Sequence, residues 1–242
     1  MIQKSIAAYD LPKRVALYDA DMEIMHPNRA KMVQVALDVF PFSPERQLRA
    51  LDLGVGTGYF AEKFLRRHPD AQVLAIDGAA AMVDLARTRL GPLAERVHFI
   101  VGDFRDLPRL LSEGESFDVV FSSYALHHLH RQDKQVVVRQ VWERLEPGGW
   151  FLNADILVAE SPEIEQRIQE IRVNGIVQRA QGIDDRFADA KATRDFLDRL
   201  EATDGDQPLT LLEDLQLLRN AGFREVTVFW LEYREAVCGG IR

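Results

Sequence analysis

Cysteine is nearly absent from this sequence, which has 242 residues and a single thiol, Cys238. Neither an intramolecular disulfide nor a cysteine-based zinc cluster can therefore form. No apolar run approaches the ~20 residues that a membrane-spanning helix needs, and the first residues lack an apolar segment followed by a small-residue cleavage site. We expect a cytoplasmic protein with no membrane partner, in which Cys238 is a buried, unreactive thiol on a strand.

Positive charge is also in short supply, with 30 lysines and arginines against 38 aspartates and glutamates and a formal net charge of −8. Binding to a phosphate backbone depends on positive charge, so this balance argues against a nucleic-acid partner. Hydrophobic residues make up 47% of the chain, which excludes a disordered protein. The length predicts one domain spanning residues 1–242.

The middle of the chain alternates short apolar segments with segments of helical periodicity. This alternation predicts an α/β fold with a parallel sheet and helices on both faces. The Pro-Gly-Gly at 147–149 is expected to end a helix and begin the fifth strand. Two adjacent segments near the C-terminus predict a terminal hairpin. The expected strands are 49–54, 71–77, 96–103, 116–126, 148–157, 225–233 and 235–242.

Two helical regions interrupt this alternation, an N-terminal cap at 1–47 and an insertion at 159–208. An insertion between late strands must cross the carboxyl edge of the sheet, where open α/β sheets bind ligands. We interpret both regions as a helical lid, although they could instead only stabilise the fold. Glu165, Arg172 and Arg186 could contact a substrate there, but they fit a solvated amphipathic helix equally well.

A glycine-rich loop at 54–58 joins the first strand to a helix. Glycines let the backbone turn tightly and approach a ligand closely, and a helix N-terminus adds unpaired N–H groups. No Gly-Lys-Ser/Thr follows, so the loop is not a P-loop. A dinucleotide fingerprint needs a small residue where Tyr59 stands, which disfavours an NAD-linked oxidoreductase.

Acidic residues end the next two strands, Asp77 after the second and Asp103 after the third. Asp77 is placed to accept hydrogen bonds from ribose hydroxyls, and Asp103 from an adenine amino group. Met82 and Phe104 could supply apolar faces for the ring. Each aspartate alone could be a helix cap or a turn residue, but together they favour an adenosine site.

Five sequence motifs occur in this order: LDLGVGTG, AIDGAAAMVDLAR, VGDFRDLP, FDVVFSSYALHHL and LEPGGWFL. With these motifs the sequence resembles the class I S-adenosylmethionine-dependent methyltransferases. The resemblance implies a Rossmann-like seven-stranded sheet ordered 3-2-1-4-5-7-6 with the last strand antiparallel, and S-adenosyl-L-methionine as cofactor. It also implies that the glycine loop approaches the methionine part of the cofactor. The predicted cofactor-binding residues are Gly54, Val55, Gly56, Asp77, Gly78, Met82, Asp103, Phe104, Ser122 and Arg29.

The segment YDADMEIMHPNRAKM and the ending GFREVTVFW resemble a narrower group, the carboxy-S-adenosylmethionine synthases and their methyltransferase relatives. Arg29 could pair with the amino-acid carboxylate of the cofactor, or lie exposed on a helix. A further arginine of the synthases has no counterpart in GDQPLTLLEDL. This departure favours plain methyl transfer to a small-molecule acceptor over a synthase-like enzyme. A non-catalytic S-adenosylmethionine-binding protein and a homodimer stay open.

The segment after the fourth strand holds the predicted catalytic residues, His127, His128 and Tyr124. A histidine titrates near neutral pH and could remove a proton from the acceptor, or it could have a structural role. Tyr124 could line the substrate cavity, and His130 is expected to be exposed. Neighbouring loop side chains are expected to diverge, and no H-x-x-x-H pair exists, so no metal site is predicted.

Overall fold

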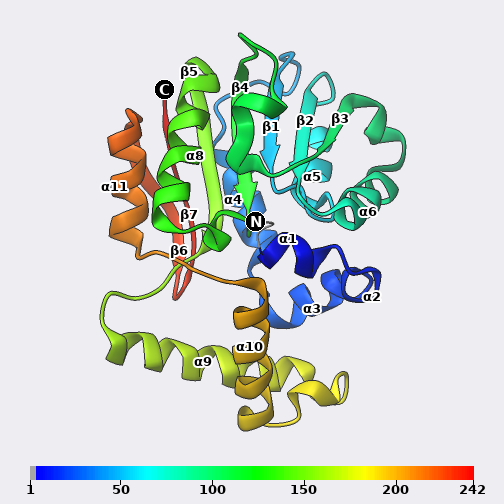
Figure 1. Ribbon diagram of the computed structural model, residues 1–242, viewed down its shortest axis with the longest axis vertical. Coiled ribbons are helices and arrows are strands. Elements are labelled where there is room, and N and C mark those ends of the chain that lie inside the picture. The colour runs from blue at the N-terminus through cyan, green and yellow to red at the C-terminus, as the bar shows by residue number, and fades with distance from the viewer. Residues whose placement is uncertain (1–3) are drawn as a thin grey trace.

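The computed structural model, which describes residues 4–242, is built on one seven-stranded sheet. Its strand order is β3-β2-β1-β4-β5-β7-β6, and β7 runs antiparallel to both neighbours, so the predicted order is confirmed (Figure 1). The strands are β1 (Arg49–Leu53), β2 (Gln72–Asp77), β3 (Val97–Val101), β4 (Phe117–Ser123), β5 (Leu145–Ile156), β6 (Arg224–Glu232) and β7 (Glu235–Ile241).

Helices cover both faces of this sheet, as the alternation of strands and helices predicts. Apolar residues of α4, α5 and α6 pack on one face, and those of α7, α8 and α11 on the other. The buried Phe121 of β4, for example, stacks on Phe60 of α5 at 4.2 Å between ring centroids. The covering helices are α4 (Arg29–Val39), α5 (Tyr59–Arg67), α6 (Ala80–Leu90), α7 (Leu107–Leu110), α8 (Arg131–Arg144) and α11 (Leu211–Ala221).

The remaining helices gather at one end of the sheet, below it in Figure 1. Three of them, α3, α9 and α10, form a small apolar cluster in which Ile176 and Leu197 are fully buried beside Met25, whereas Val15 of α2 packs against Met82 of α6. Because they come from the two regions that interrupt the strand–helix alternation, distant parts of the chain meet there. These helices are α1 (Lys4–Tyr9), α2 (Pro12–Val15), α3 (Tyr18–Met25), α9 (Pro162–Ala180) and α10 (Ala190–Asp204).

The structure corrects the sequence-based prediction around the fourth and fifth strands. β4 ends at Ser123, and residues 126–128 form a 3-10 turn instead of a strand. β5 already begins at Leu145, because the Glu-Pro-Gly-Gly segment continues as a bulged strand. Gly148 supplies the positive φ of 81° that this bulge contains. The Pro-Gly-Gly segment therefore belongs to an irregular strand, and the preceding helix already ends at Arg144.

Cys238 lies buried in β7, as predicted, and burial raises the pKa of its thiol to about 12. Among the described residues, no helix is both long enough and apolar enough to cross a membrane.

A buried ion pair links α8 to α11 on one face of the sheet. Lys134 Nζ lies 2.7 Å from Asp214 Oδ1, and both side chains are at most 5% exposed. Removing one partner of such a pair leaves an uncompensated buried charge, which usually costs ~3–5 kcal/mol. Replacing both partners by apolar residues avoids that cost.

We therefore expect Lys134→Met to lower the free energy of unfolding by about 3–5 kcal/mol, measured by urea denaturation at pH 7. The double variant Lys134→Met/Asp214→Leu should recover most of this loss. If the double variant were as unstable as the single one, packing of the lysine side chain, rather than its charge, would account for the effect.

Candidate functional site

The glycine loop bends away from β1 and brings its backbone to the carboxyl edge of the sheet. Gly54, Gly56 and Gly58 have φ of 76°, 53° and 78°, in the region that other residues rarely adopt. A Cβ at Gly54 would lie 2.4 Å from Cβ of Ala125, in the segment after β4. The loops after β1 and β4 therefore meet closely enough to exclude a side chain.

Asp77, at the end of β2, holds this loop in place. Its carboxylate accepts hydrogen bonds from the backbone N–H of Gly56 at 2.8 Å and of Ala79 at 2.9 Å. The helix-cap alternative is wrong, because the N-cap position of α6 is Ala79; Asp77 instead bonds to the N–H two residues on, as in an Asx turn, and its side chain lines the cavity described next. Burial raises the pKa of Asp77, although these hydrogen bonds lower it.

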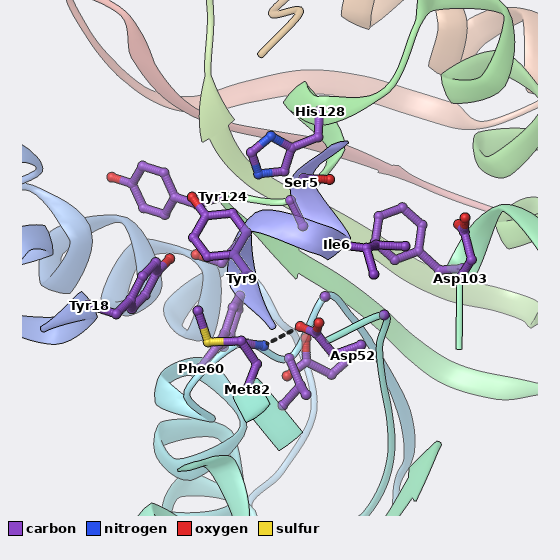
Figure 2. A pocket seen from close by; sticks show the side chains of 18 residues that line it. Ser5, Ile6, Tyr9, Tyr18, Asp52, Phe60, Met82, Asp103, Tyr124 and His128 are labelled. Carbon is purple, nitrogen blue, oxygen red and sulfur yellow. Dashed lines mark hydrogen bonds between the residues drawn. The ribbon is translucent and has the colours of Figure 1, made fainter. Parts of the chain in front are cut away.

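A cavity of about 720 Å³, measured out to its mouth, opens at this edge, within the ~300–1,000 Å³ typical of small-molecule sites. Figure 2 shows its tyrosines on one side and Asp103 on the other, with Ile6 of α1 between them. Most predicted site residues meet here. Those that line the cavity are Gly54, Val55, Gly56, Asp77, Gly78, Met82, Asp103, Phe104, Tyr124 and His128.

Asp103 combines a local structural role with a place in the cavity wall. Its carboxylate accepts the N–H of Arg105 at 3.0 Å, as an N-cap does, and also pairs with the Arg105 guanidinium. The predicted turn role is therefore present. The side chain remains 28% exposed at the cavity, next to the buried ring of Phe104.

Asp52 lies in the cavity wall and was not among the predicted site residues. One oxygen of its buried carboxylate lacks a hydrogen-bond partner among the described residues. It is 1% exposed, and no hydrogen bond from any described residue reaches its Oδ2. Burial, followed by the charge of Asp77, raises its pKa well above the usual value. A ligand cation or donor beside Asp52 would satisfy this oxygen.

Two of the predicted cofactor-binding residues do not line this cavity. Ser122 is fully buried and donates its hydroxyl hydrogen bond to the carbonyl of Leu53 at 2.8 Å, so the wall contains Ser123 in its place. Arg29 pairs with Asp19 at 2.7 Å and lies over the ring of Tyr59. Its guanidinium is thus neither exposed nor directed at the cavity wall.

The two histidines after β4 face different surroundings. His127 is buried, with Nδ1 2.6 Å from Asp155 Oδ1, while its backbone N–H bonds to the other carboxylate oxygen. His128 lines the cavity and its Nδ1 lies 2.9 Å from Asp206 Oδ1. The two rings lie only 4.0 Å apart between centroids, so the expectation that these neighbours diverge is wrong. His130 is exposed, as predicted.

A second chamber adjoins the cavity, and Tyr9, Tyr18 and Tyr124 line both. The Tyr124 hydroxyl donates to Glu235 Oε1 at 2.7 Å, and that of Tyr9 to Asp204 Oδ2 at 2.9 Å. The hydroxyls of Tyr9 and Tyr124 are therefore already engaged at the boundary that the two chambers share. Other charged or titratable residues lining the second chamber are Arg14, Asp21, His26, His127, Arg172, Glu201, Asp204 and Asp206.

The predicted contact residues of the inserted helices differ in position. Arg172 is 9% exposed, pairs with Glu201 at 2.5 Å and lines the second chamber. Arg186 pairs with Asp21 and Asp184 at the surface, and Glu165 accepts from the backbone N–H of Ala159. A solvated-helix interpretation therefore fails for Arg172, because α10 packs against its helix.

Sequence reasoning also missed Asp155 and Asp206, which face the histidines. Asp206 follows α10, 78 residues beyond His128, and no local motif indicates that the two meet. Asp155 occupies an ordinary position in β5. A buried acid within the apolar strand was the available signal, because buried carboxylates need partners.

The raised pKa of Asp52 makes stability depend on pH. The folded state keeps its proton to a higher pH than the unfolded state, so stability falls as pH rises above the unfolded pKa of ~3.9. Asp52→Asn, which mimics the protonated acid, should therefore be more stable than the wild type by about 1–3 kcal/mol at pH 8.

Urea denaturation between pH 4 and pH 8 measures this difference, which should shrink towards pH 4. The exposed Asp195→Asn, which loses only a surface pair with Lys191, serves as the control and should change stability by under about 1 kcal/mol. A difference for Asp52→Asn that does not vary with pH would refute the assignment.

Comparison with known proteins shows which family this chain resembles. A family described as "Methyltransferase domain" matches residues 50–149. An uncharacterized methyltransferase of Geobacillus thermodenitrificans is 30% identical over 155 residues, which cover 64% of this chain and 67% of that protein. The carboxy-S-adenosyl-L-methionine synthase of Nautilia profundicola is 21% identical over 91% of this chain and 88% of its own length.

Among solved structures, an O-methyltransferase family protein from Burkholderia thailandensis shares the fold, with a TM-score of 0.70 and 20% identity. The match covers 100% of this chain and 64% of that one, and the chain spans only about half the length of some curated relatives. The matched family segment contains the glycine loop, both aspartates after the strands and the two histidines. The chain belongs to the S-adenosylmethionine-dependent methyltransferase family.

Proposed function

We propose that this protein transfers the methyl group of S-adenosylmethionine to a small-molecule acceptor. The observation that carries the proposal is the cavity at the carboxyl edge of the sheet, where the glycine loop, Asp77 and Asp103 lie around one space continuous with a second chamber. A cytoplasmic location and a homodimer stay predictions.

The residues present fit the cofactor. The bend at Gly54–Gly58 leaves room for a ligand against the backbone, and the buried Asp52 Oδ2 has no partner among described residues. An amino-acid end offers the ammonium group that this oxygen lacks. Asp77, at the end of β2, and Asp103, after β3, line the same cavity and could accept hydrogen bonds from the nucleoside.

The second chamber suits an acceptor of limited size. Tyr9, Tyr18 and Tyr124 are common to both spaces, so an acceptor held in the second chamber reaches the first between aromatic rings. The chamber also contains charged groups of both signs, such as Arg14 and Asp204. An acceptor with polar substituents fits this lining better than a purely apolar one.

S-adenosylmethionine, when bound, supplies a methyl group on a positively charged sulfur that leaves readily. The protein itself then contributes by aligning the acceptor with the methyl group and by excluding water. Good alignment of two reactants can lower the activation barrier by ~7–11 kcal/mol. The ring of His128 and the ring of Tyr124 border the place where the two spaces meet. These two residues and His127 are the proposed groups that position the acceptor or receive its proton.

A second candidate function is carboxy-S-adenosylmethionine synthesis, favoured by the long alignment with the Nautilia profundicola synthase. Arg29, the arginine expected to hold a carboxylate, is instead paired with Asp19 and lies outside the cavity lining. Mass spectrometry of the ligand that copurifies from cells separates the two functions, because a carboxylated cofactor would indicate the synthase.

For the proposed cofactor site, we expect Asp77→Ala to weaken binding of S-adenosylhomocysteine by at least about tenfold. This corresponds to the ~1.5–3 kcal/mol of a hydrogen bond to a charged group. Isothermal titration calorimetry measures the affinity, and circular dichroism checks that the variant folds. The exposed Asp70→Ala, in the turn before β2, is the matched control and should bind like the wild type.

Unchanged affinity in folded Asp77→Ala would contradict the ribose assignment. Equal thermal stabilisation by NAD and by S-adenosylhomocysteine would contradict the cofactor itself. Cofactor binding without methyl transfer to any member of a broad acceptor panel would instead favour a non-catalytic binding protein.

A further inference from the structure

The side chains of His127, His128 and Asp206 converge where the two chambers meet. One potential ligand atom from each residue lies within 4.8 Å of the other two. His128 Nδ1 is 2.9 Å and His127 Nε2 is 3.6 Å from the same oxygen, Asp206 Oδ1. Atoms that share one zinc ion at ~2.0–2.2 Å are separated by similar distances.

We propose that His127, His128 and Asp206 form a binding site for a divalent transition-metal ion, with zinc as the ion that its two imidazoles and one carboxylate fit. Three protein ligands leave a coordination position open, as in catalytic zinc sites. Binding requires the three ligand atoms, which now lie within 4.8 Å of one another, to move to bonding distance of one ion.

The surroundings of His127 are those of a metal ligand. Asp155 Oδ1 lies 2.6 Å from Nδ1, where a carboxylate accepts a hydrogen bond from the ring N–H, so Nε2, 3.6 Å from Asp206 Oδ1, is the nitrogen left to bind an ion. A carboxylate behind a ligating histidine fixes the ring and raises its basicity. The backbone N–H of His127 bonds to the other oxygen of Asp155, so the ring and its loop are held by one side chain.

Charge supports the same assignment. Asp155 and Asp206 are buried or nearly so, at 2% and 14% side-chain exposure. Two carboxylates taken out of water need a nearby positive charge, which a bound cation would supply.

The position of the site gives it a role that rests on the proposed function. His128 lines the cofactor cavity beside Tyr124 (Figure 2), whereas His127 and Asp206 line the second chamber. An ion held by all three would stand at the junction and offer its open position to the acceptor. It would bind an acceptor through oxygen and favour the deprotonated form of a hydroxyl there, so the two histidines would act together as ligands.

The test uses untagged, chelator-treated full-length protein titrated with Zn²⁺ alone at pH 7 by isothermal titration calorimetry. We expect one equivalent of Zn²⁺ to bind per chain. Asp155→Asn should weaken binding by ~10–100-fold, as for other residues behind a ligand. His128→Ala and Asp206→Asn should weaken it further, while His130→Ala, which removes an exposed histidine from the same loop, should not.

A second readout follows the ligands directly. Co²⁺ in place of Zn²⁺ should give visible d–d absorption that Asp206→Asn and His128→Ala alter and His130→Ala leaves unchanged. Absence of stoichiometric Zn²⁺ binding, or binding that persists in folded Asp206→Asn and His128→Ala, would overturn the proposal.

Titration of S-adenosylhomocysteine into the same metal-free samples separates this inference from the proposed function. If the cofactor product binds and Zn²⁺ does not, the metal site is wrong and the cofactor site stands. If Zn²⁺ binds as expected and the cofactor product does not, the methyl-transfer proposal fails and the metal site stands.

Discussion

The absence of a side chain at Gly54 is the constraint on which the site depends. The position that a Cβ would occupy lies 2.4 Å from Ala125, so only glycine allows the loop after β1 to touch the loop after β4. One loop carries the backbone that approaches the ligand, and the other carries Tyr124, His127 and His128. Their contact places the proposed cofactor space directly beside the proposed chemistry.

The polar groups of the cofactor cavity differ in how they are satisfied. Asp77 and Asp103 already bond to backbone or arginine donors, whereas Asp52 Oδ2 has no partner among the residues described. Unpaired buried groups reduce stability, and they are retained most readily where a ligand completes them. The cluster around the histidines likewise brings two carboxylates out of water, those of Asp155 and Asp206.

The helices at the carboxyl edge connect this site to distant parts of the chain. Arg14 and Tyr9, from the N-terminal region, both meet Asp204 at the end of α10. Arg172 of α9 meets Glu201 of α10. The wall of the second chamber is thus assembled from the segment before β1 and from the insertion between β5 and β6, and the interpretation of these segments as a lid stays a prediction.

Local patterns in the sequence were enough to predict the alternating strands and helices, the glycine loop and most of the cavity lining, while the strand order followed from the resemblance to the class I methyltransferases. Glycines, acids at strand ends and the alternation of strands with helices determine the local conformation within a few residues. Parallel strands then bring their carboxyl ends to the same edge of the sheet, wherever the strands lie in the chain. The bulged start of β5 was missed because proline and glycine signal both a turn and an irregular strand.

Tertiary structure alone decided the pairings between distant side chains. Asp19 holds Arg29 outside the cavity wall, and Asp206 approaches His128 after α10 folds back across the sheet edge. Asp52 lies on an ordinary strand, and its unpaired oxygen is visible only once the surrounding loops are in place. Such pairings depend on how charged groups compete for partners when water is excluded, and a single sequence does not specify that competition.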